Sequence, residues 1–156
     1  MSRSIKDLIP AMQERAAMAV KAMNEDKELK ALGTDGVFIS ETRRTLAVQM
    51  AYYSRGRMEP SDIQKMYKAA GLYDIGTAEA KSKNTWTLQS KHIEGKAIDI
   101  VPLINERAVW TCPPGFDKAK FNRILERIGE IGKEHGLIWG GDWDVKDYPH
   151  FEMDED

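Results

Sequence analysis

The chain has 156 residues, 42% of them hydrophobic and 31% charged, with a formal net charge of -2 at pH 7. This length and balance are typical of one globular domain that buries its core without metal or disulfide support. The slightly negative charge argues against a general nucleic-acid binder, which would carry an excess of Lys and Arg. Cys112 is the only cysteine, so no intramolecular disulfide can form, as expected in a reducing compartment.

The N-terminal part of the chain shows helical periodicity. Apolar residues at three- and four-residue steps from Leu8 to Met23 predict one amphipathic helix over about 7–32, which stops at Gly33. Further helix signals predict helices over about 45–54, 60–70 and 121–135. Residues 72–84 have no strong period and are predicted to form a loop.

Short apolar or alternating segments predict strands over 37–40, 86–88 and 97–101, with extended structure again at 137–139. Helices and strands are mixed without a regular βαβ alternation. The sequence therefore predicts an α+β fold in which helices pack on a small, largely antiparallel sheet. One domain covers 1–156, and an acidic tail over 152–156, ending in Asp-Glu-Asp, is expected to be solvated.

Two motifs concentrate groups that bind metals. Residues 90–99 read S-K-H-I-E-G-K-A-I-D, and residues 139–151 read W-G-G-D-W-D-V-K-D-Y-P-H-F. Imidazoles and carboxylates together suit zinc better than calcium or magnesium. Gly95 permits a turn that brings His92 toward Asp99 on the following strand, and His150 can complete three ligands. Three protein ligands leave a fourth position for water, as in a catalytic zinc site.

Other residues with metal-binding or catalytic side chains have simpler interpretations. His135 lies at the C-terminal end of a predicted helix, where an imidazole is favourable without any ligand. Asp142 and Asp144 lack the spacing of a calcium loop and are expected on the surface or behind the site. Ser90 is expected to orient the His92 loop by hydrogen bonding, because no Ser-His-acid order makes it a nucleophile. The helical H-E-x-x-H signature is absent.

The two motifs resemble those of peptidase family M15, the group of D-Ala-D-Ala carboxypeptidases and L-alanyl-D-glutamate endopeptidases. The first is similar to S-x-H-x-x-G-x-A-x-D, and the second to W-G-G-x-W followed by acid-x-P-H-F. The resemblance implies a Hedgehog/DD-peptidase-like fold, Zn²⁺ bound by His92, Asp99 and His150, and Asp147 as general base and acid. Asp147 precedes His150 by three residues across Pro149, which predicts an extended or turn segment.

Residues 44–49, R-T-L-A-V-Q, resemble the family's R-S-x-x-x-Q. By that resemblance Arg44 holds the substrate and the developing oxyanion, although the aromatic residue that usually precedes the arginine is missing and Arg43 is an alternative. The predicted substrate-binding residues are Arg43, Gln49, Ser90 and Trp139. Trp139 and Trp143 are expected to line the site or to pack in the core.

The resemblance implies a zinc peptidase that cuts the stem peptide of bacterial peptidoglycan at the L-alanyl-D-glutamate bond. Alternatives are a D-Ala-D-Ala carboxypeptidase or dipeptidase, and an inactive zinc-containing module that binds peptidoglycan. Asp147 in place of a glutamate, the short chain and the absence of a signal-peptide core suggest a phage or prophage endolysin. It is expected to be a monomer without stable membrane association, made in the host cytoplasm and reaching the wall after holin-mediated release.

Overall fold

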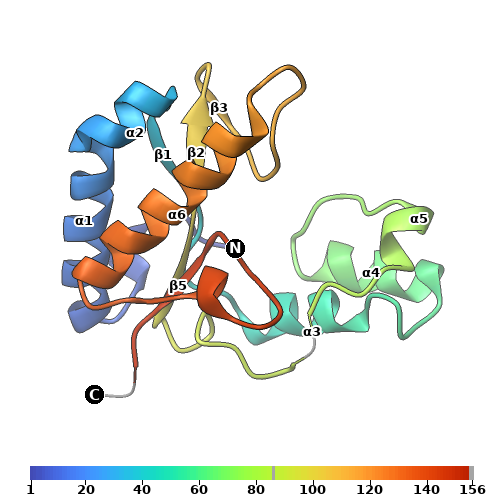
Figure 1. Ribbon diagram of the computed structural model, residues 1–156. Coiled ribbons are helices and arrows are strands. Elements are labelled where there is room, and N and C mark those ends of the chain that lie inside the picture. Colours follow the sequence, from blue (N-terminus) through green and yellow to red (C-terminus); the bar gives the residue numbers. More distant parts are fainter. Residues whose placement is uncertain (86, 155–156) are drawn as a thin grey trace.

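A computed structural model describes residues 1–85 and 87–154 (Figure 1). Across these residues, helices lie on both sides of a central sheet. In chain order the elements are η1 (Ile5–Asp7), α1 (Pro10–Glu25), α2 (Lys27–Leu32), β1 (Gly36–Glu41), α3 (Leu46–Ser54), α4 (Pro60–Ala69), α5 (Thr77–Ala80), β2 (Ala97–Ile104), β3 (Arg107–Ala108), α6 (Lys118–Glu134), β4 (Ile138–Trp139), η2 (Gly140–Asp142) and β5 (His150–Glu152). In this part of the chain, no helix combines the length and the apolar character needed to cross a membrane.

The sheet is antiparallel throughout its described strands. Its order is β1-β2-β5-β4, and β3 pairs with the far end of β2. The register pairs Asp99 on β2 with Glu41 on one side and with His150 on the other. Paired residues share a face of a sheet, so these three polar side chains form a row across three strands. The predicted α+β architecture with a small antiparallel sheet is confirmed.

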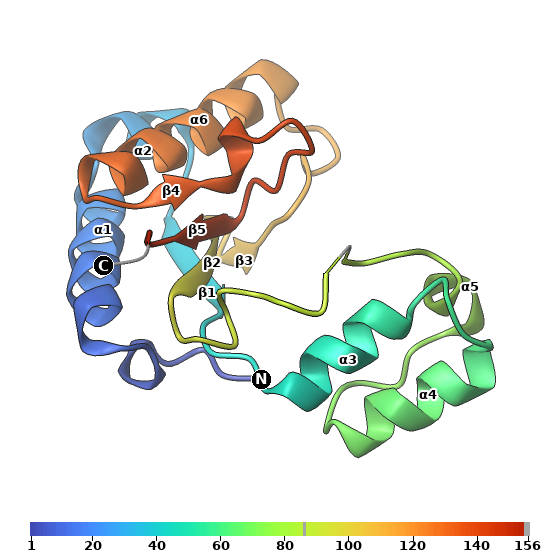
Figure 2. The ribbon, with the colours of Figure 1, turned by 90° about the horizontal axis from the view of Figure 1, so that it is seen from below.

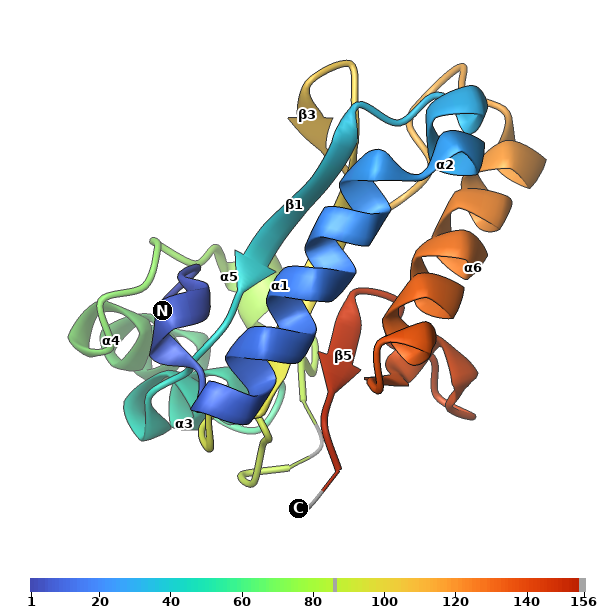
Figure 3. The same cartoon turned by 90° about the vertical axis from the view of Figure 1, so that its left-hand side faces the viewer.

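One face of the sheet forms the main core with α1, α2 and α6, which Figure 3 shows from their outer side. The predicted apolar stripe of α6 is confirmed, since it buries Phe121, Ile124, Ile128 and Ile131. The same helix approaches the sheet closely at two glycines. A Cβ atom on Gly129 would lie 2.4 Å from the Trp139 ring, and one on Gly132 would lie 2.2 Å from Phe151. Glycine is therefore required for α6 to pack this tightly.

Helices α3, α4 and α5 form a separate helical lobe, defined here as residues 46–80. Figures 1 and 2 show this lobe on the side of the sheet opposite α1 and α6. It has a small core of its own, built by Ala51, Ile63, Tyr67, Ile75 and Ala80. The chain enters the lobe just after β1 and returns to β2 through a segment described over residues 81–85 and 87–96.

The helix predicted over 7–32 is wrong as a single element. It is divided into η1, α1 and α2, with Pro10 at the first position of α1. At Asp26 the backbone is extended (φ -67°, ψ 126°), and its carboxylate accepts a hydrogen bond from the Leu29 amide at 3.0 Å. The carboxylate also receives two hydrogen bonds from Arg127 on α6, at 2.8 and 3.2 Å. Capping and this tertiary ion pair outweigh the continuous apolar period.

Three other boundaries differ from the prediction. The loop predicted over 72–84 contains the short helix α5, and β2 continues three residues beyond 101. The strand predicted over 86–88 is not formed at residues 87–88, and Trp86 lies outside the described residues. The tail predicted to begin at 152 starts later, because Glu152 belongs to β5 and Met153 is fully buried in the core.

Candidate active site

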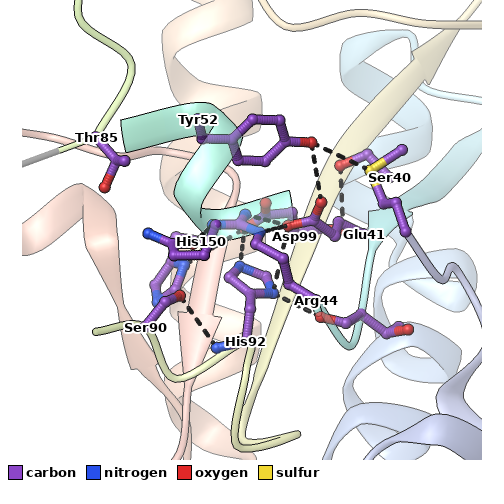
Figure 4. A network of polar contacts seen from close by, with 12 residues as sticks. Ser40, Glu41, Arg44, Tyr52, Thr85, Ser90, His92, Asp99 and His150 are labelled. Atoms are coloured by element: carbon purple, nitrogen blue, oxygen red, sulfur yellow. Dashed lines mark hydrogen bonds and ion pairs between the residues drawn. The ribbon is translucent and has the colours of Figure 1, made fainter. Parts of the chain in front are cut away.

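His92, Asp99 and His150 meet on the polar face of the sheet (Figure 4). His92 Nε2 lies 3.2 Å from Asp99 Oδ1, and His150 Nδ1 lies 3.4 Å from the same oxygen. One ligand atom from each residue lies within 4.8 Å of the others. The structure thus brings together all three residues predicted to hold the metal, from a turn, a central strand and a C-terminal strand.

The turn at Gly95 places His92. Gly95 has φ +73°, and the Lys96 amide donates to the Lys91 carbonyl at 2.9 Å, closing the turn immediately before β2. The predicted role of Ser90 in orienting this loop is supported by its hydroxyl, which accepts a hydrogen bond from the His92 amide at 3.2 Å. The Arg44 amide donates to the His92 carbonyl at 3.0 Å, which ties the loop to the start of α3.

Each histidine has a second partner on its other ring nitrogen. His92 Nδ1 lies 2.6 Å from the Thr42 carbonyl, and His150 Nε2 lies 2.8 Å from Glu152 Oε1. An N–H on each of these nitrogens would leave a lone pair on the nitrogen that faces Asp99. A histidine that binds zinc usually donates its other ring N–H to a carbonyl or carboxylate, as both histidines can here. The two histidines and Asp99 therefore fit Zn²⁺.

The side chains also set the charges in the cluster. Burial alone would raise the pKa of Asp99, but hydrogen bonds from His150 and His92 outweigh it and hold that pKa below its usual value. Burial would lower the pKa of His150, whereas hydrogen bonds to Asp99 and Glu152 raise it to about 9. The carboxylates around His150 therefore favour positive charge at this point of the site, which is also what a metal cation would supply.

Asp147 stands beside this cluster in the predicted turn, which is confirmed by a 3.2 Å hydrogen bond from the His150 amide to the Asp147 carbonyl. The Asp147 amide donates to the Gly140 carbonyl at 2.9 Å, and a Cβ on Gly140 would lie 2.4 Å from the Asp147 carbonyl oxygen. Asp147 is solvent-accessible, yet desolvation by the surrounding protein and the charge of Asp99 raise the pKa of its carboxyl. A raised pKa suits an acid that must both accept and return a proton.

Arg44 also borders the cluster, and neighbouring side chains hold its guanidinium in place. Its Nε donates to Glu41 at 2.7 Å, one terminal nitrogen donates to Gln49 at 2.6 Å, and the other also contacts Glu41. Tyr52 packs against the guanidinium with its ring centre 4.8 Å away. One N–H on each terminal nitrogen remains for a ligand, because the guanidinium carries two on each.

A cleft of about 680 Å³ joins these groups. It is lined by Arg44, Asn84, Thr85, Thr87, Gln89, Ser90, Lys91, His92, Asp99, Trp110, Trp143, Val145, Lys146, Asp147, Pro149, His150 and Glu152. The predicted metal ligands, the predicted base and the predicted arginine therefore face one space. Arg43 lies outside it, on a second hollow of about 500 Å³ that borders the N-terminus. Between the two neighbouring arginines, the geometry favours Arg44.

Two predicted substrate-binding residues are buried. Gln49 has no exposed surface, and its amide donates to the Thr87 carbonyl at 2.8 Å while its oxygen holds Arg44. Trp139 is 5% exposed, packs in the main core and donates to the Tyr148 carbonyl at 2.8 Å. Gln49 holds Arg44, and Trp139 holds the backbone next to Asp147. Neither side chain lines the cleft, whereas Ser90 does.

Three residues that support the site were not predicted from the sequence, namely Glu41, Thr42 and Glu152. Glu152 lies two residues after His150 in a strand, and this period of two could have placed both on one face. Glu41 is only 4% exposed, and its Oε1 lies 3.8 Å from His92 Nδ1 as well as against Arg44. No local pattern marks Glu41 or Thr42, because their roles depend on how β1 pairs with β2.

Comparison with known proteins identifies the family. A family described as D-alanyl-D-alanine carboxypeptidase matches residues 83–153, which include both motifs. The peptidoglycan L-alanyl-D-glutamate endopeptidase CwlK of Bacillus subtilis (strain 168) is 31% identical over 149 residues, covering 94% of this chain and 74% of CwlK. The chain belongs to peptidase family M15. The predicted enzyme class, a metallopeptidase, is therefore confirmed.

Solved structures agree on the fold of this M15 peptidase. The L-Ala D-Glu endopeptidase ChiX of Serratia marcescens has a TM-score of 0.52 at 21% identity, with 98% of this chain and 87% of ChiX covered. The vancomycin resistance D,D-pentapeptidase VanY, solved with Zn(II), has a TM-score of 0.50 at 17% identity, with 94% and 72% covered. The predicted DD-peptidase-like fold in a single domain is confirmed.

Proposed function

We propose that this M15 peptidase is a zinc-dependent endopeptidase that cleaves the L-alanyl-D-glutamate bond in the stem peptide of bacterial peptidoglycan. The observation that carries the proposal is the shared cleft, in which the three ligand atoms lie within 4.8 Å of one another beside Asp147 and Arg44. The choice of bond is supported by the 31% identity to CwlK over most of this chain.

His92, Asp99 and His150 would hold the zinc. When bound, zinc supplies a Lewis acid that polarises the scissile carbonyl and makes water acidic near neutral pH. The Thr42 carbonyl and the Glu152 carboxylate orient the two imidazoles and keep their ring N–H groups turned away from the ligand side. Asp99 contributes one negative charge, so the occupied site keeps a net positive charge.

Asp147 acts as the proton carrier. Its carboxylate, whose pKa is raised, takes a proton from the attacking water and returns it to the nitrogen of the leaving amine. Arg44 presents its two remaining N–H groups to the carbonyl oxygen as negative charge develops there, or to a substrate carboxylate. Glu41 and Gln49 fix the guanidinium in that orientation before substrate arrives.

Mass spectrometry of digested peptidoglycan fragments tests the bond that is cut. The proposal expects a new free amine on D-glutamate with the terminal D-alanine retained. Metal analysis of protein purified without added metal should find one zinc per chain, and less in a His150→Ala variant. Equal zinc in both proteins would remove His150 from the ligand set.

A D-Ala-D-Ala carboxypeptidase or dipeptidase is the second candidate, supported by the description of the family that matches residues 83–153. Such an enzyme would use the same residues to cleave a different bond, and release of D-alanine alone would favour this second candidate. A silent zinc-containing module that binds peptidoglycan is disfavoured by Asp147, because binding needs no proton carrier.

We also propose that the enzyme acts as a phage or prophage endolysin, made in the host cytoplasm and released to the wall by a holin. The proposal is supported by the resemblance of the motifs and by aspartate at position 147. Added protein should lyse Gram-negative cells only after their outer membrane is permeabilised, and cytoplasmic expression without a holin should be tolerated. Lysis during expression without a holin would contradict this route.

A further inference from the structure

The cleft is lined by apolar side chains that the proposed peptide chemistry does not use. Trp110, Trp143 and Val145 all line it, with exposed fractions of 54%, 37% and 74%. Single exposed apolar side chains are ordinary, but three that border the same cleft as the catalytic groups indicate a binding surface.

The two tryptophans occupy different parts of this cleft. The Trp143 ring packs on His150 with 5.1 Å between ring centres, so it lies at the metal ligands. Trp110 directly follows Val109, whose amide donates to the Pro102 carbonyl at 3.0 Å. Pro102 lies three residues from Asp99 along β2, which is about 10 Å at the usual rise of a strand. Trp110 therefore lines the cleft from a segment that lies along β2 away from Asp99, and this part of the cleft is called the Trp110 end.

Besides charged groups such as Lys91, Lys146 and Glu152, the cleft lining includes neutral polar side chains. Asn84, Thr85 and Gln89 offer amides and hydroxyls from the segment that returns from the helical lobe, and Figure 4 shows Thr85 beside the cluster. The carboxylates of a stem peptide have a better partner in Arg44 at the ligand end. A cleft that offers an indole together with neutral donors and acceptors suits a ligand that has an apolar face and a polar rim.

We propose that the Trp110 end of the cleft binds the N-acetylated sugar to which the stem peptide is joined. A pyranose ring presents C–H groups on one face, which can pack on the indole, while its hydroxyls and acetamido group meet the neutral polar side chains. This inference rests on the proposed function, because that sugar precedes the L-alanyl residue and so lies on the amino side of the bond to be cut.

The test compares two substrates that differ only in the sugar. One is a stem peptide joined to its N-acetylated muramic sugar, and the other is the same peptide with an acetyl group in place of the sugar. The parent enzyme should prefer the first by kcat/KM. Trp110→Ala should lose about 3- to 10-fold on the sugar-bearing substrate, mainly through KM, and keep its rate on the plain peptide.

Leu88→Ala is the matched control, since Leu88 is 47% exposed and does not line the cleft. Equilibrium binding of both ligands by calorimetry gives a second readout that needs no cleavage. Equal losses on both substrates, or no loss, would overturn the sugar site. The product spectrum separates this from the proposed function: D-alanine release would reject the proposed bond, while the substrate ratio still tests the contact of Trp110 with the sugar.

Discussion

The two faces of the sheet are built by the same strands but have different roles. On β2, Ile98 and Ile100 enter the main core, while Asp99 between them faces the cleft. On β5, Phe151 is buried against α6, and its neighbours His150 and Glu152 line the cleft. Alternation along a strand therefore lets one short sheet supply both a core and an active site.

The faces differ in what holds them together. The face toward α1 and α6 gains free energy from apolar burial and close packing. The cleft face holds the carboxylates of Glu41, Asp99 and Glu152 at low exposure, and such carboxylates are costly unless paired. We therefore expect substitutions on the first face to lower stability, and those on the second to lower activity or metal binding.

The largest expected effect is on the cleft face. Asp147→Asn should reduce turnover by about 10²- to 10⁴-fold, because the amide keeps the size of the side chain but cannot accept the proton. Steady-state kinetics measures turnover, and thermal unfolding of the same preparation measures stability. The unfolding midpoint should barely change. Asp144→Asn is the control, since Asp144 is exposed nearby without lining the cleft. Turnover within about threefold of the parent would rule out Asp147 as base.

The opposite result is expected in the main core. Ile128→Ala should lower the free energy of unfolding by about 2–5 kcal/mol, since Ile128 is 2% exposed and its truncation leaves a cavity between α6 and the sheet. Urea unfolding measures this loss. At a temperature where the variant is still folded, its turnover should match that of the parent. A large loss of turnover in the folded variant would show that the two faces are coupled.

Arg44→Lys and Arg43→Lys form a matched pair. Arg44→Lys should lower kcat/KM by about 10- to 100-fold, because an ammonium cannot keep the bonds to Glu41 and Gln49 while presenting two donors to the substrate. Arg43→Lys should change it by less than about threefold, since Arg43 faces the other hollow. If the two effects are reversed, the assignment of the arginine is wrong by one residue.

Glu152→Gln should weaken zinc binding by about 10- to 100-fold, because the amide no longer accepts the His150 ring N–H as strongly. Competition with a chelator of known affinity measures this change. Glu134→Gln, on the exposed surface of α6, is the control. Unchanged zinc affinity in the Glu152 variant would show that His150 is oriented without this carboxylate.

The smallest expected effect lies outside both faces, at the break between α1 and α2. Asp26→Ala should cost about 1 kcal/mol of unfolding free energy through the lost cap. Hydrogen bonding to Arg127 lowers the pKa of Asp26, so its contribution is complete above the unfolded pKa of about 4 and is lost as pH falls through the folded value. Unfolding at pH 7 and at pH 3 measures this, and the difference between parent and variant should shrink at the lower pH.

Elements and site residues whose signals are local could be predicted from the sequence. The apolar stripe of α6, the turn at Gly95 and the turn before His150 follow from periodicity, glycine and proline. The motifs also identified the three residues that cluster at the polar face. The division at Asp26 could not be predicted, because it depends on an ion pair with Arg127, about a hundred residues away in the chain.

The surroundings of these three residues depend on strand pairing, which local sequence does not specify. The pairing of β1 with β2 shifts between Ile39 and Glu41, so that Ile39 opposes Ile100 while Glu41 opposes Asp99. In a regular strand Glu41 would lie on the same face as Ile39. The bulge turns Glu41 to the opposite face, where it meets His92 and Arg44. A shift in strand register depends on contacts between distant segments, which is why Glu41 behind Arg44 and Thr42 behind His92 carry no signal in the sequence.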